Sequence, residues 1–136
     1  MHIRLLNTAV TAVILIFCLH TSIPVGAEQL TVADYVTLEL EARRITLMGV
    51  RQRLALLQSN ATFDIQMQED NATQQQVDNI YRQYGITIPS ALIWASQHRQ
   101  AIDNYLTNHP DRQDEYDRIA DELDAVSKQI QTLLQR

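Results

Sequence analysis

Four arginines on one predicted helix are the residues best suited to binding chemistry. Arg43 and Arg44 form one cluster, and Arg51 and Arg53 form a second, about two turns later. Arg43 falls in line with the apolar positions of this helix, and an inward guanidinium is costly unless a carboxylate or a ligand pairs with it. Glu39 precedes Arg43 by four residues, a favourable order for an ion pair along a helix. The sequence leaves open whether Arg43 binds a ligand or pairs with Glu39.

Other kinds of reactive centre lack the residues that they need. His98 and His109 are the only histidines after residue 27, and no cysteine follows Cys18, so a tetrahedral metal site cannot be completed. A haem held by Met48 or Met67 with one of these histidines is an alternative, which the usual role of Met as core filler disfavours. No serine stands in the sequence context of a nucleophile elbow. The sequence therefore predicts no metal, no cofactor and no activated nucleophile.

The first 27 residues are typical of a secretory signal peptide. Arg4 gives a basic start, an apolar run spans residues 9–19, and the small residues Val25-Gly26-Ala27 are typical of a signal-peptide cleavage site. The apolar run is shorter than the roughly 20 residues that span a bilayer, so we expect cleavage after Ala27, with an uncleaved anchor as the alternative. Residues 28–136 would then form one domain, which is periplasmic or secreted.

The charge of the chain disfavours two classes of partner. The net charge is −5, and loss of a signal that holds Arg4 but no acidic residue would make it −6. No basic stripe is present, so we expect neither nucleic acid nor an anionic membrane surface as a partner. Phe17 precedes Cys18, where a lipoprotein signal usually has a small residue, so a lipid anchor is not expected either.

The longest predicted helix spans residues 30–57. Its apolar positions recur in steps of three and four at Val36, Leu40, Leu47, Val50, Leu54 and Leu57. Thr31 and Asp34 are placed to cap its first turn, and Leu30 can pack on Tyr35 as a hydrophobic staple. Gly49 in its interior is either a tolerated weak point or a close approach of another helix.

A polar loop and a short helix are predicted next. Residues 58–73 are rich in Asn and Gln, and we interpret the glycosylation acceptor patterns at Asn60 and Asn71 as capping and turn residues. Thr73 then starts a short helix over residues 74–84, which Gly85 terminates.

Two more long helices complete the prediction. Thr87 and Pro89 begin a helix that runs to about residue 107, and Pro110 begins the last. The apolar stripe of this last helix is the natural partner of the first, and it comprises Tyr116, Ile119, Leu123, Val126, Ile130 and Leu133. The sequence thus predicts an all-α fold, a small bundle of three long helices and one short helix joined as antiparallel hairpins.

The order of features from Arg43 to Leu106 resembles that of the exported, all-helical chorismate mutases. The motifs that carry the resemblance are Leu47-Met48 and Val50 after the arginine, Phe63-Asp64, Glu69-Asp70, Tyr84-Gly85-Ile86, Gln97 and Ala101-Ile102. The resemblance implies that a small dicarboxylate binds within the bundle and rearranges through positioning and charge stabilisation. The ligand-binding residues that it implies are Arg43, Arg44, Arg53 and Gln97. This chain departs from the family in having Leu54 where a lysine is usual and Glu69-Asp70 where an Arg-Glu pair is usual.

Because no complete catalytic set is present, we predict a binding protein rather than an enzyme. The expected role is contact with another exported protein, as an adaptor, an inhibitor or a chaperone-like module. Trp94 lies off the centre of its stripe, and we expect it at the surface with Tyr81, Tyr84 and Tyr105 as partner-binding residues. Two alternatives stay open: a divergent or inactive chorismate mutase-like protein, and a structural homodimer that pairs the two long stripes between chains.

Overall fold

A computed structural model describes residues 30–135 of the chain. These residues form five helices, α1 (Val32–Gln58), α2 (Phe63–Gln83), α3 (Ile88–Gln97), α4 (Arg99–Asn108) and α5 (Pro110–Leu134), and no strand. The all-α prediction is confirmed, although five helices replace the four expected. The predicted signal peptide, with Cys18, and the terminal Arg136 lie outside the described residues. None of the described helices is both long and apolar enough to cross a membrane.

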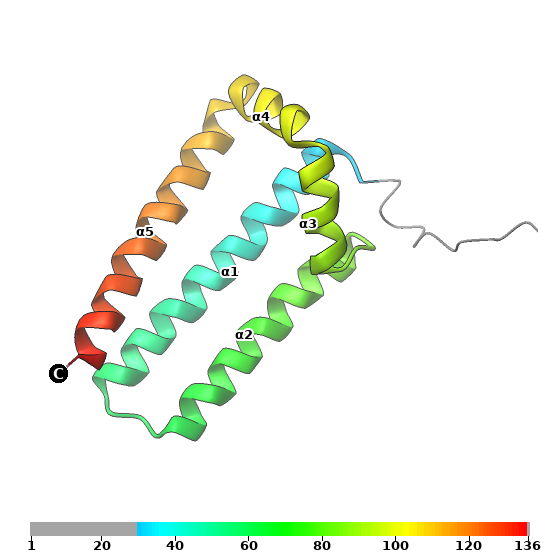
Figure 1. Cartoon of the computed structure of the whole chain (residues 1–136). Coiled ribbons are helices and arrows are strands. Elements are labelled where there is room, and N and C mark those ends of the chain that lie inside the picture. The colour runs from blue at the N-terminus through cyan, green and yellow to red at the C-terminus, as the bar shows by residue number, and fades with distance from the viewer. Residues whose placement is uncertain (1–29, 136) are drawn as a thin grey trace, which may run out of the picture.

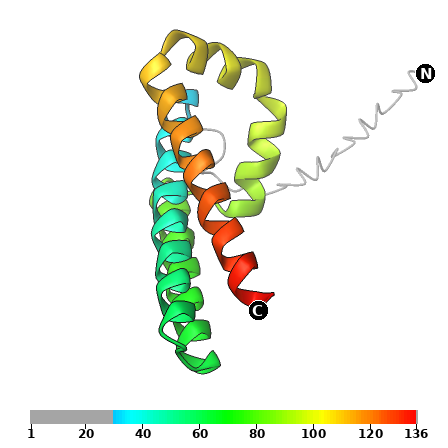
Figure 2. The same cartoon turned by 90° about the vertical axis from the view of Figure 1, so that its left-hand side faces the viewer.

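The three long helices form one layer with α1 in the middle (Figure 1). α2 returns antiparallel to α1, whereas α5 runs parallel to it (Figure 1). The prediction of antiparallel hairpins throughout is therefore wrong for α5. α3 and α4 form an arch that stands over one face of this layer near the N-terminal end of α1 (Figure 2). The arch carries the chain from the end of α2 to the start of α5 and makes the parallel arrangement possible.

The start of α1 follows its sequence signals. The side chain of Thr31 accepts a hydrogen bond from the Asp34 amide at 3.1 Å, and the Asp34 carboxylate accepts one from the Thr31 amide at 3.4 Å. This reciprocal capping box satisfies two donors that a helix start leaves unpaired. Leu30 and Tyr35 are both buried in the core, as a hydrophobic staple requires.

The segment predicted as a loop is mostly helix, so that prediction is wrong. Only residues 59–62 connect α1 to α2, and Asn60 takes the left-handed conformation there, with φ of 54°. Thr73 lies inside α2 rather than at its start. A Cβ on Gly49 would lie only 2.4 Å from Cγ2 of Thr73, which confirms the close approach of a helix at this glycine. Small and polar residues make this contact, so the hydrophobic pattern gives no sign of the helix.

The helix predicted to run to residue 107 is broken at His98, contrary to expectation. Its start is as predicted, because the Thr87 side chain accepts a hydrogen bond from the Ser90 amide. At the break, the His98 ring stacks on Trp94 with centroids 4.0 Å apart, and its Nδ1 bonds the Trp94 carbonyl at 2.7 Å. The carbonyl can only accept, so Nδ1 carries the proton. The break turns α4 across the layer, away from the direction of α3.

α5 packs along α1 in parallel register. Arg44 bonds Glu115 at 2.5 Å, and Arg51 pairs with Glu122, each pair separated by the same 71 positions. The predicted pairing of the two apolar stripes is confirmed in their first halves. The most deeply buried side chains of the core are Val36, Leu38, Leu40 and Ile119. Farther along, the stripe of α1 is only half-buried, at Val50, Leu54 and Leu57.

Candidate binding cleft

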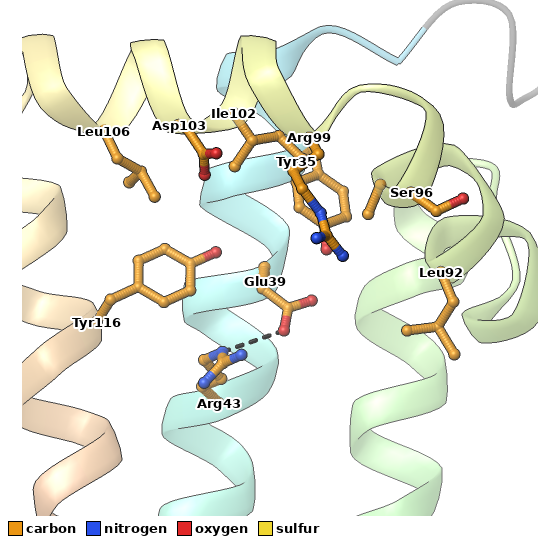
Figure 3. Close-up of a pocket in the computed structure, with 11 residues that line it drawn as sticks. Tyr35, Glu39, Arg43, Leu92, Ser96, Arg99, Ile102, Asp103, Leu106 and Tyr116 are labelled. Atoms are coloured by element: carbon orange, nitrogen blue, oxygen red, sulfur yellow. Dashed lines mark hydrogen bonds and ion pairs between the residues drawn. The ribbon is translucent and has the colours of Figure 1, made fainter.

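A cleft of about 300 Å³ opens between α1, the α3–α4 arch and α5 (Figure 3). α1 supplies its floor, with the arch and α5 on either side. The polar lining residues are Tyr35, Glu39, Arg43, Ser96, Arg99, Asp103 and Tyr116, and the apolar ones are Leu92, Ala95, Ile102 and Leu106. The cleft thus combines an aliphatic wall from the arch with two cationic and two anionic side chains.

Glu39 is the central polar group of the floor. One of its carboxylate oxygens accepts a hydrogen bond from Nε of Arg43 at 3.1 Å, and the other accepts one from the hydroxyl of Tyr81 at 2.8 Å. The guanidinium carbon of Arg43 also lies 5.0 Å from the ring centre of Tyr116, within cation–π range. Only 17% of the Glu39 side chain is exposed. The ion pair that the sequence left open is therefore present, and the hydrogen bond from Tyr81 ties the cleft floor to α2.

Three tyrosines around Glu39 are held in the neutral form. Burial, with the charge of Glu39, raises the pKa of Tyr35 to about 12. The same two causes raise the pKa of Tyr116 well above its ordinary value. They also raise the pKa of Tyr81, with a further contribution from the hydrogen bond that it donates to Glu39. All three hydroxyls therefore stay neutral well into the alkaline range, and that of Tyr81 donates its hydrogen to Glu39.

Arg99 and Asp103 enter the cleft from one turn of α4. Figure 3 shows Arg99 reaching down beside the ring of Tyr35, and the carboxylate of Asp103 directed into the cleft. Within residues 30–135 neither side chain makes an ion pair, with the other or with a third group. Sequence reasoning missed both residues. Their spacing of four, beside the apolar Ile102 and Leu106, is the pattern that could have found them.

The four ligand-binding residues implied by the chorismate mutase resemblance lie in different places. Only Arg43 lines the cleft. Arg44 faces α5, and Arg53 bonds Asp70 of α2 at 2.5 Å beside a separate hollow of about 420 Å³. Gln97 is exposed at the end of α3. The structure therefore does not bring these four side chains together around one ligand.

The expected exposure of Trp94 and Tyr81 is wrong. Each is only 7% exposed, and Trp94 stacks on Tyr35 with ring centroids 5.2 Å apart. The break at His98 explains the error for Trp94, because its predicted position assumed one continuous helix through residue 107. Tyr84 and Tyr105 are half-buried. The exposed apolar side chains of α3 are instead Leu92 at 65% and Ile93 at 60%.

Comparisons with protein families, with curated proteins and with solved structures find no match for this chain. Its function must therefore be argued from the cleft itself. In the part of the chain that the structure describes, no group of three or more His, Cys, Asp or Glu side chains is placed to hold a metal ion. The chemistry that the cleft offers is charge recognition beside an aliphatic wall.

Proposed function

We propose that this protein is an exported binding protein that holds a segment of another protein in the cleft between α1, α3, α4 and α5. The observation that carries the proposal is the mixed lining of the cleft, in which charged groups stand beside an aliphatic wall. Recognition sites are typically concave and largely apolar, with a few polar groups that fix orientation. The described residues make no comparable arrangement of unpaired charges in the hollow beside Arg53, where the cation is already paired with Asp70.

The size of the cleft favours part of a larger partner. Its volume of about 300 Å³ is at the lower end of the range for sites that enclose a whole small molecule. Leu92 lines the cleft and is 65% exposed, and Ile93 beside it is 60% exposed. An apolar rim of this kind gives a partner surface to contact after one group has entered the cleft.

The proposal is tested with peptides displayed in a random library and selected on the purified protein. Selected peptides are then titrated calorimetrically against wild type, Leu92→Ala and Leu134→Ala. The two leucines are equally exposed, at 65%, but Leu134 lies at the far end of α5. We expect about tenfold weaker binding to Leu92→Ala, since a lost leucine contact of about 1.4 kcal/mol is a factor of ten. Binding to Leu134→Ala should be unchanged.

Two results would reject the proposal. One is a library that yields no binding peptide, and the other is a set of peptides that bind both leucine variants equally well. A small dicarboxylate is a second candidate ligand, favoured by the two guanidinium groups, Arg43 and Arg99, that line the same cleft. Saturable binding of chorismate in the same calorimeter, lost in Arg43→Ala, would support this candidate in place of the peptide.

A further inference from the structure

We infer that the segment held in the cleft is the C-terminal residue of a partner protein and that this residue has a large aliphatic side chain. Arg99 binds its terminal carboxylate, Asp103 accepts the hydrogen bond of its amide N–H, and its side chain packs against the wall of the arch. The inference rests on the proposed function and names the chemistry of the partner.

Arg99 is the guanidinium of the cleft that is available to a ligand. Arg43 is engaged by Glu39 at 3.1 Å and by the ring of Tyr116, whereas Arg99 makes no ion pair with any residue from 30 to 135. An arginine that precedes an aspartate by four positions has the less favourable order for a helical ion pair, which fits the separation of Arg99 from Asp103. A guanidinium has the planar, forked geometry that binds a carboxylate through two parallel hydrogen bonds.

A chain end matches this pair of charges better than an internal segment. The Cβ atoms of residues four apart on a helix are roughly 6 Å apart, so Arg99 and Asp103 present opposite charges over a short span. A C-terminal residue carries a carboxylate and an amide N–H on the same Cα, so it can pair with the cation and the anion at the same time. An acidic side chain within a segment holds its carboxylate one or two carbons farther from its own amide N–H, so it fits this short span less closely. Capture of a terminal carboxylate is one of the recurring modes of peptide recognition.

Besides the carboxylate and the amide N–H, the ligand needs an apolar side chain to fill the aliphatic part of the cleft. Leu92, Ile102 and Leu106 line the same cleft, whose volume of about 300 Å³ is at the small end of the range for ligand sites, so only the end of a chain enters it. The residues that precede the terminal one must then leave the cleft. Leu92, which lines the cleft and is exposed, is placed to contact them. This continuation is why we assign the carboxylate to a protein chain rather than to a free amino acid.

The test uses the selected peptides in two forms, with a free C-terminal carboxylate and with a C-terminal amide. We expect amidation to weaken binding to the wild-type protein at least tenfold. We expect Arg99→Gln to weaken binding of the free acid by a similar factor and to make the protein indifferent to amidation. Arg82→Gln is the matched control, because Arg82 is also exposed, makes no ion pair within residues 30–135 and lies on α2, away from the cleft.

The outcomes separate this inference from the proposed function. Wild-type protein that binds the amide as tightly as the acid overturns the inference and leaves the proposed function standing. Equal losses in Arg99→Gln and Arg82→Gln also overturn it, because a general electrostatic effect would then suffice. Free leucine or N-acetylleucine that binds as tightly as the peptide overturns the assignment to a chain end. The amidation experiment needs no variant, so it stays decisive even if Arg99→Gln folds poorly.

Discussion

The contact between Gly49 of α1 and Thr73 of α2 makes a prediction with an unusual sign. In the interior of a helix, replacing glycine with alanine normally stabilises a protein by about 1 kcal/mol. Here the new Cβ would lie 2.4 Å from Cγ2, 2.5 Å from Oγ1 and 2.9 Å from Cβ of Thr73. Thr73 is β-branched and fixed in a helix, so its side chain has few rotamers with which to move away. Gly49→Ala should therefore destabilise the fold.

The size of the effect follows from two opposing terms. Overpacking a close contact costs about 1–3 kcal/mol, and the helix propensity of alanine returns about 1 kcal/mol. The net expectation is a loss of about 1 kcal/mol in the free energy of unfolding. Thr73→Gly removes every atom that the new Cβ would meet, so Gly49→Ala should stabilise the Thr73→Gly variant, by about 1 kcal/mol, instead of destabilising it. We expect a coupling energy of about 2 kcal/mol between the two sites, since the overpacking cost is lost when Thr73 is glycine.

Urea unfolding of the four proteins, followed by circular dichroism, measures this double-mutant cycle. The slope of the free energy against urea should be the same in all four, so that the midpoints report stability alone. A more stable Gly49→Ala variant, together with a coupling energy near zero, would refute the reasoning. That result would mean that α2 does not approach α1 at Gly49, and the fold described here would need a different helix register.

Two further predictions concern the tyrosines and the oligomeric state. Tyr35 has its pKa raised from 10 to about 12 in the folded state, so its contribution to stability is complete below pH 10 and is lost as the pH rises toward 12. The loss of stability should reach about 1 kcal/mol by pH 11. The urea midpoint of Tyr35→Phe should therefore fall less steeply with rising pH than that of wild type. Parallel declines would contradict the raised pKa of Tyr35. The apolar stripes of α1 and α5 pack against each other within one chain, so light scattering of residues 28–136 should give the mass of a monomer, whereas a dimer mass would favour the structural homodimer.

The fold was predictable wherever one strong local signal acted alone. Thr31 with Asp34, Gly85 and Pro110 each mark a helix end that the structure contains. The first half of the stripe of α1, at Val36, Leu40 and Leu47, identified its core face for the same reason, because a period of three and four leaves one face to bury. The direction of α5 could not be predicted, because the apolar stripe of a helix has the same pattern whether the helix packs parallel or antiparallel to its neighbour.

The first half of α2 was missed because its packing is not hydrophobic. Its contacts with α1 include Thr73 on Gly49 and Asp70 on Arg53, while its apolar residues Phe63, Ile65 and Met67 are exposed at 71%, 45% and 39%. Apolar periodicity alone therefore predicts a loop for such a segment. The glycine was the informative residue, since a helix that lacks a Cβ at one point is a helix that another backbone can approach.

The break at His98 is the feature that creates the cleft. A single straight helix through residue 107 would carry Arg99, Asp103 and Leu106 onward in the direction of α3. The turn at His98 instead lays α4 across α1, so that these residues face Arg43 and Tyr116 over the cleft. No glycine or proline marks this turn; the ring of His98 holds it by stacking on Trp94 and bonding the Trp94 carbonyl.

The burial of Trp94 and the break at His98 therefore have one cause. The stack of Tyr35, Trp94 and His98 buries the tryptophan and fixes the break beside it. Trp94 thus has a structural role, because the arch packs around its ring. The binding groups are the side chains that the arch places over α1. The side chains best placed to bind a partner are therefore Arg99, Asp103 and the aliphatic wall beside them, which remain accessible, and not the buried aromatic residues.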